Sequence, residues 1–250
     1  MKLIINADDF GLTSGVTKGI HDCLTNGVLT STTLMVTMPN FLDAVKIIKE
    51  NSLKNIGLHL NISLGSPLTK CDSLVNLDNK FIKPKILTND DKYKCEDICN
   101  EFNAQYQRFV KYIGQNPSHL DSHLYVHQIF EKVKKEIIIL SEKIEVPVRD
   151  IDTKFYKKIT FERNFKALKG ENLDDMIDKF KNLIIKNKKL GVDVLELMVH
   201  PGYVDDDLMK ISSYNVGRKL ELDVLMSSTI RTFLKNEKIQ LISYLDIERN

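Results

Sequence analysis

The pattern that decides the fold first appears in the stretch Leu3-Ile4-Ile5-Asn6-Ala7-Asp8-Asp9-Phe10-Gly11. Three aliphatic residues form a short strand candidate, and two carboxylates follow it on a tight turn that leads to a helix candidate. A strand that ends in polar residues and continues into a helix is the unit of parallel α/β folds, in which active sites form at the carboxyl ends of the strands. The same unit recurs along the rest of the chain.

Short aliphatic or β-branched runs alternate with longer segments of helical period. This alternation predicts an α/β fold built from βα units, with about seven parallel strands. The strand candidates are 3–6, 32–37, 56–60, 118–123, 146–149, 194–200 and 239–244. The helix candidates are 14–26, 41–51, 95–113, 129–144, 173–189 and 216–236.

A single domain, 1–250, is expected, because the sequence contains no internal repeat, low-complexity tract or linker. Two stretches, 63–93 and 150–170, interrupt the alternation and are expected as excursions from a barrel. Long loops of this kind often cover the substrate in compact enzymes, but decorative or disordered insertions have similar compositions. Both interpretations are open at this point.

The composition limits the classes of function. The 36 basic and 34 acidic residues nearly cancel, so no nucleic-acid partner is expected. No apolar run is long enough to span a bilayer and no signal-peptide core precedes Asn6, so we expect a cytoplasmic protein without a membrane partner. The 4 cysteines are too sparse for a disulfide scaffold and are expected to be reduced.

Three polar residues in or after strand candidates could carry chemistry. Asp8 and Asp9 are adjacent, and adjacent side chains on an extended backbone point to opposite sides, so one could hold a metal while the other acts as a base. A turn that begins at Asp9 and a helix capped by Ser14 would explain the same residues without chemistry. His59 lies inside an apolar strand, where a lone histidine is more often structural than a ligand.

The strongest cluster is His119-Leu120-Asp121-Ser122-His123-Leu124-Tyr125-Val126-His127. At strand period, His119, Asp121 and His123 share one face and would point into the same space. A helix would instead align His119, His123 and His127, but the preceding proline and the alternation favour a strand that ends in a loop. The cluster predicts a metal site.

Another strand candidate ends in the turn His200-Pro201-Gly202-Tyr203. Proline and glycine force a turn there, which displays the His200 ring at the end of the strand. The ring is a candidate general acid, and a turn histidine bonded to local backbone is the alternative. Glu196 shares the face of His200 and could orient it or pair with Arg149.

Together these motifs resemble the YdjC-like carbohydrate deacetylase family, relatives of the polysaccharide deacetylases. The resemblance covers nearly the whole chain and rests on residues 6–11, 57–60, 119–123 and 200–203. Residues 67–68, 73–75 and 218–222 also resemble the family. One departure affects the shape and polarity of the sugar subsite: family members commonly carry a further polar residue and a histidine where this chain has Leu124-Tyr125.

The resemblance implies a distorted, TIM-barrel-like (β/α) barrel and one divalent metal ion held by Asp9, His59 and His123, with Asp8 matching the general base. It implies Mg²⁺, whereas two imidazoles with one carboxylate suit Zn²⁺, Co²⁺, Ni²⁺ or Mn²⁺ better. It also implies an N-acetylated oligosaccharide substrate of the chitin type, such as diacetylchitobiose, and suggests a homodimer.

In the resulting hypothesis, the chain is a metal-dependent hydrolase in which a metal-bound water attacks the acetyl carbonyl. Asp8 removes the water proton and His200 protonates the leaving nitrogen. The residues expected to orient the ligands or to contact the substrate are His119, Asp121, His127, Arg149, Glu196 and Tyr203.

Two other classes of protein fit the same residues. A metal-dependent phosphoesterase also uses His and Asp clusters, commonly around two metal ions about 4 Å apart. A sugar-binding protein that kept the scaffold and lost turnover is the second alternative, since a fold alone does not define an activity. Release of acetate from diacetylchitobiose separates the three classes.

Overall fold

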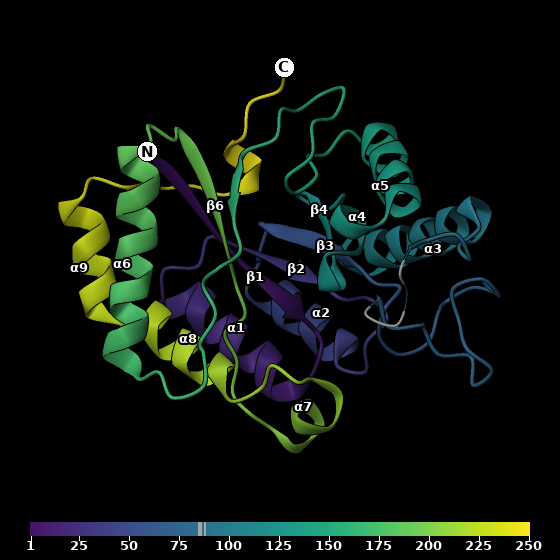
Figure 1. Ribbon diagram of the computed structural model, residues 1–250, viewed down its shortest axis with the longest axis horizontal. Helices are drawn as coiled ribbons and strands as arrows, with labels where there is room; N and C mark the ends of the chain where they lie inside the picture. The colour runs from purple at the N-terminus through teal and green to yellow at the C-terminus, as the bar shows by residue number, and fades with distance from the viewer. Residues whose placement is uncertain (85–86, 88) are drawn as a thin grey trace. The chain divides into compact units, whose positions relative to one another are not determined.

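The computed structural model describes residues 1–84, 87 and 89–250 of the chain (Figure 1). These residues form two compact units. The first consists of Met1–Thr32 and Ile159–Ile247, and the second of Thr33–Lys158 and Glu248–Asn250. Within the predicted excursion 63–93, residues 85, 86 and 88 lie outside the described part of the chain. The single domain stays a prediction.

Parallel strands form the centre of the first unit. β1 (Lys2–Phe10) pairs with β6 (Val194–Val199) and with β7 (Gln240–Leu241), and β6 also pairs with β5 (Thr160–Glu162). β1 and β6 are almost entirely buried and rich in aliphatic residues, which is typical of parallel strands that are covered on both faces.

The helices of the first unit begin at residues suited to cap them. Thr13 caps the first helix, because its Oγ1 accepts the Val16 N–H at 3.3 Å; the alternative that Ser14 is the cap is wrong. Asn172 forms a capping box with Asp175 at the start of α6. The bounds are α1 (Ser14–Asn26), α6 (Leu173–Lys189), α7 (Asp206–Ile211), α8 (Gly217–Met226) and α9 (Ser228–Asn236).

The second unit contains two short parallel strands and the remaining helices. β3 (Ile56–Leu60) pairs with β4 (Leu120–Ser122), so that Leu58 lies opposite Leu120. A 3-10 turn, His123–Tyr125, follows β4 directly. The helices are α2 (Phe41–Glu50), α3 (Cys95–Ile113), α4 (Val126–Ile129) and α5 (Glu131–Ile144).

The chain passes from the first unit to the second within β2 (Ser31–Leu34). The strands of the 7-stranded sheet follow the order β4-β3-β2-β1-β6-β5, with β7 also paired to β1. Along this order β1 to β4 are consecutive neighbours, and β5 lies beside β6, as repeated βα units predict. The predicted α/β fold with about seven strands is confirmed.

The predicted strand 146–149 is wrong. In this segment only Val148 makes an isolated bridge, to Leu120, and it also pairs with Ile151 in an antiparallel turn. Pro147 removes a ladder donor, and Asp150 adopts a left-handed φ of 55°, which turns the chain back. The fifth strand is β5, inside the predicted excursion 150–170.

The predicted helix 216–236 is two helices. Ser227 between them is extended, with φ −66° and ψ 134°, and its side chain caps α9. Serine favours this position because its hydroxyl accepts a helical N–H. The short helix α7 was not predicted, and Asp205 caps it. Among the described residues, no helix combines the length and the apolar character needed to cross a membrane.

Candidate functional site

The carboxyl ends of β1 and β6 carry the polar cluster of the first unit. Ala7 pairs with Val199, so Asp8 and His200 follow at the same end of neighbouring strands. His200 Nε2 lies 4.0 Å from Asp8 Oδ2, and both side chains are buried. The Asn6 amide donates to Asp8 Oδ1 at 3.0 Å.

Asp9 has different partners from Asp8. Its φ of 72° lies in the left-handed region, so the backbone turns between the two carboxylates. The Arg218 guanidinium on α8 donates to Asp9 Oδ2 at 2.6 Å, and both side chains are buried. Arg218 Nε also donates to the Tyr214 carbonyl oxygen at 2.8 Å. Separate roles for the two aspartates stay a prediction.

Glu221 on α8 supports the His200 turn. Its carboxylate accepts the His200 backbone N–H at 2.5 Å and the Tyr214 hydroxyl. Burial raises the pKa of Glu221 to about 7, while these two hydrogen bonds lower it. Burial lowers the pKa of the His200 ring to about 3, although the Asp8 charge opposes the shift. The ring is therefore neutral at pH 7.

Two buried atoms in this cluster, His200 Nδ1 and Arg218 Nη1, have no hydrogen-bond partner within the described part of the chain. Buried polar groups in folded proteins are normally satisfied. The Tyr214 ring lies 5.8 Å from the His200 ring centroid and 5.8 Å from Arg218 Cζ. His200 Nδ1 and Arg218 Nη1 are therefore candidates for contacts with a bound substrate.

In the second unit, a chain of hydrogen bonds orients His59 on β3. Its Nδ1 lies 2.6 Å from Asp121 Oδ1. The carboxylate only accepts, so Nδ1 carries the proton and Nε2 is the nitrogen that would bind a metal. Asp121 Oδ2 accepts from the Thr33 hydroxyl at 3.0 Å and pairs with Arg149 Nη1 at 2.9 Å. Asp121 therefore orients His59, and Arg149 orients Asp121.

His119 and His123 do not share the predicted strand face. β4 covers only Leu120–Ser122, so His119 precedes it and His123 begins the following turn. His119 bonds to the Ser118 hydroxyl at 3.0 Å and packs on Gly57, where an added Cβ would lie 2.5 Å from the ring. Here the contacts of His119 are those of a core residue.

Tyr203 and Glu196 were also expected to orient the ligands or to contact the substrate, and each has a hydrogen-bond partner in its own unit. The Tyr203 hydroxyl donates to Asp22 on α1 at 2.9 Å. Glu196 accepts the Tyr244 hydroxyl. The orientation of His200 by Glu196 and the pairing of Glu196 with Arg149 stay predictions.

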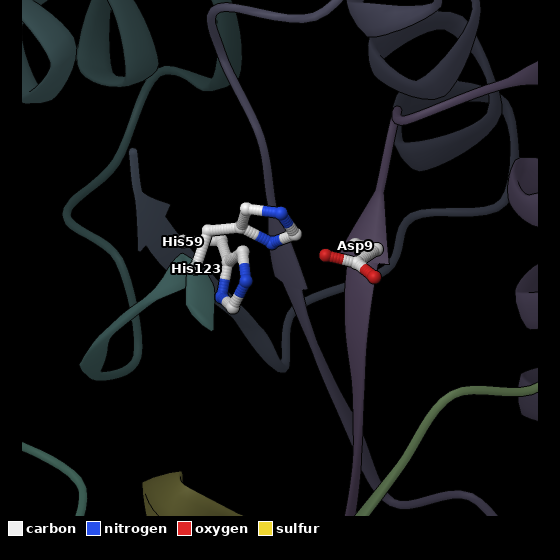
Figure 2. A group of neighbouring side chains, drawn as sticks. All are labelled: Asp9, His59 and His123. Atoms are coloured by element: carbon white, nitrogen blue, oxygen red, sulfur yellow. The ribbon is translucent and has the colours of Figure 1, made fainter. Parts of the chain in front are cut away.

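Side chains with donor atoms for a metal ion occur in both units, Asp8 and Asp9 in the first and His59, Asp121 and His123 in the second. Figure 2 draws Asp9 with the two histidines. The His59 and His123 rings meet edge to face, with centroids 5.5 Å apart. The described residues thus include Asp and His side chains that could bind a metal ion.

Sequence reasoning assigned no role to Arg218, Glu221, Tyr214 or Thr33. The first two lie three residues apart on one helix face, and both are buried. The signal that was present is their place in residues 218–222, which resemble the family.

The fold and the site define an α/β protein of parallel strands with buried acidic and histidine side chains at the strand ends. The chain belongs to the YdjC-like protein family, whose model matches residues 2–236.

Three known proteins are similar to the chain over nearly its full length. It is 44% identical over 253 residues to carbohydrate deacetylase 2 of Listeria innocua, covering 100% of both chains. It is 31% identical to a chitooligosaccharide deacetylase of Proteus mirabilis, covering 98% of each. A crystal structure of an Enterococcus faecalis protein has a TM-score of 0.83 and 30% identity, covering 97% of each chain.

Proposed function

We propose that this protein is a metal-dependent carbohydrate deacetylase that removes acetyl groups from N-acetylglucosamine units of short oligosaccharides such as diacetylchitobiose. The support is the family membership and the two relatives named as deacetylases of carbohydrates and chitooligosaccharides, which match the chain over nearly its full length. A cytoplasmic location and a homodimer stay predictions from the sequence.

In the proposed site, Asp9, His59 and His123 would hold one divalent ion (Figure 2). One carboxylate and two imidazoles suit Zn²⁺, Co²⁺, Ni²⁺ or Mn²⁺, while the resemblance implies Mg²⁺. The hydrogen bond between His59 Nδ1 and Asp121 supports the assignment, because it leaves Nε2 in the form that binds metal. When bound, the ion would polarise the acetyl carbonyl and lower the pKa of water at the site.

Asp8 is proposed as the base and His200 as the donor of the proton to nitrogen. The observation that carries both roles is the separation of 4.0 Å between Asp8 Oδ2 and His200 Nε2 in a buried setting. Because the His200 ring is neutral at rest, it must gain a proton before it can give one. Asp8 takes a proton from the attacking water and passes it to Nε2, which then protonates the leaving nitrogen.

The Asp8→Asn variant tests this proposal. The amide cannot accept the water proton, so acetate release from diacetylchitobiose by zinc-reconstituted protein is expected to fall about 10²–10⁴-fold. The metal content, measured by mass spectrometry, is expected to stay at the wild-type level. Asp43→Asn, at an exposed position on α2, is the matched control and is expected to change neither quantity.

Each alternative gives a different result. Unchanged acetate release by Asp8→Asn would remove Asp8 from its role. Phosphate release from a phosphorylated sugar, without acetate release by the wild type, would indicate a phosphoesterase with two ions per chain. Binding of the sugar without either product would indicate a sugar-binding protein.

A further inference from the structure

Two consecutive residues directly after His123 adopt a strained backbone. Leu124 has φ 54° and ψ 30°, and Tyr125 has φ 59° and ψ 24°. Residues with large side chains seldom adopt this left-handed region, because their Cβ atom crowds the following carbonyl. Two such residues in succession persist only where surrounding contacts hold them.

These contacts come from Ser122 and His127, at the two ends of the turn. The His127 backbone N–H donates to Ser122 Oγ at 3.1 Å, and the same Oγ lies 2.5 Å from His127 Nδ1. His127 Nε2 lies 3.3 Å from the Arg149 carbonyl oxygen. A carbonyl only accepts, so we assign the proton to Nε2; Nδ1 then accepts from the Ser122 hydroxyl, whose oxygen accepts the backbone N–H.

The network excludes a role for His127 as a metal ligand. Both ring nitrogens are engaged with protein atoms, and the side chain is 0% exposed. Arg149 connects the network to the other histidine, because its guanidinium pairs with Asp121, which bonds to His59. Arg149 therefore takes part in both networks: its guanidinium pairs with the partner of His59, and its carbonyl oxygen contacts His127 in the turn after His123.

We infer that His127 is a positioning residue, which together with Ser122 closes the strained turn and fixes the His123 ring against the His59 ring. The two rings meet at 73° with centroids 5.5 Å apart. His127 acts through the turn and not on the substrate. The inference rests on the proposed function only in taking His59 and His123 as ligands of one ion.

Zinc affinity, measured by calorimetry on the full chain, tests the inference without reference to turnover. His127→Phe keeps a ring and removes both ring hydrogen bonds, and it is expected to weaken zinc binding about 10–100-fold, as for other outer partners of metal ligands. His127→Asn is expected to recover most of this loss, because its amide oxygen can accept from Ser122 in place of Nδ1. At saturating zinc, the KM for diacetylchitobiose is expected to stay unchanged in both variants.

A second pair of variants tests the strain itself. Leu124→Asn, added to His127→Phe, is expected to regain several-fold in zinc affinity, because asparagine tolerates the left-handed region. Leu124→Ala is the matched control, since it removes the side chain and keeps the strain, and it is expected to regain nothing. Equal recovery by both would overturn the strained-turn account.

If His127→Phe folds and its zinc affinity is within about twofold of the wild-type value, the inference is overturned. If His127→Phe does not fold, Ser122→Ala removes the other half of the network and must show the same weakening. Wild-type affinity in that variant would likewise overturn it. The expected affinity pattern without acetate release from the wild type would support the positioning role and contradict the proposed function.

Discussion

The two units hold their candidate site residues in different ways. In the first unit, Asp9 itself belongs to a buried ion pair, with Arg218, which lies 209 residues further along the chain. In the second unit, the corresponding charge pair joins Asp121 to Arg149. His59 is not a member of this pair, but its ring bonds to Asp121. Loss of the Arg218 cation should therefore cost folding stability, and loss of the Asp121 carboxylate should in addition lower the metal affinity through His59.

The largest expected effect tests the first half of this comparison. Arg218→Met leaves the buried Asp9 carboxylate without this cation, which typically costs about 3–5 kcal/mol. Urea unfolding of metal-free protein, followed by circular dichroism, measures the change in the free energy of unfolding. Arg231→Met on α9 is the matched control, because that guanidinium is exposed and donates to the Asn26 carbonyl oxygen.

If Arg218→Met lowers the free energy of unfolding by less than about 1 kcal/mol, the Asp9–Arg218 pair is worth no more than an exposed pair, and the contrast between the units is removed. A double variant sharpens the test. Asp9→Asn with Arg218→Met removes both charges, and it is expected to be more stable than Arg218→Met alone, because no buried charge is then unpaired.

The same contrast explains what could be predicted from the sequence. Asp8, Asp9 and His59 were found because each lies in or just after an aliphatic run, and such runs mark buried parallel strands. Arg218 and Glu221 received no role, because only tertiary structure brings their helix to the ends of β1 and β6. Local pattern locates strand ends, but it does not identify partners that are distant in sequence.

The length of β4 was also predicted wrongly from the sequence. The cluster 119–127 contains an alternation that predicts a strand over 118–123, yet β4 has only 3 residues. The Ser122–His127 hydrogen bonds make a turn more favourable than continued pairing, and such side-chain bonds compete with ladders without changing the hydrophobic pattern. Periodicity therefore predicted the strand but not the residue at which it ends.

The second effect, of intermediate size, tests the other half of the comparison. Asp121→Asn keeps the shape of the side chain but removes the charge that fixes the His59 proton on Nδ1, so zinc affinity is expected to fall about 10–100-fold. Calorimetric titration with zinc chloride measures this change. Asp206→Asn, exposed on α7, is the matched control. An affinity equal to that of the wild type would show that the His59 tautomer does not depend on Asp121.

The smallest effect separates two tyrosines of the first unit. The Tyr203 hydroxyl bonds to Asp22 on α1, and both residues are half-buried, so Tyr203→Phe is expected to cost about 1 kcal/mol or less and to leave acetate release unchanged. The Tyr214 hydroxyl accepts the Ala167 N–H at 2.8 Å and donates to buried Glu221, so Tyr214→Phe is expected to cost about 1–3 kcal/mol. Urea unfolding and acetate release measure both variants. A large loss of acetate release in Tyr203→Phe, with unchanged stability, would instead place Tyr203 against the substrate, as the sequence predicted.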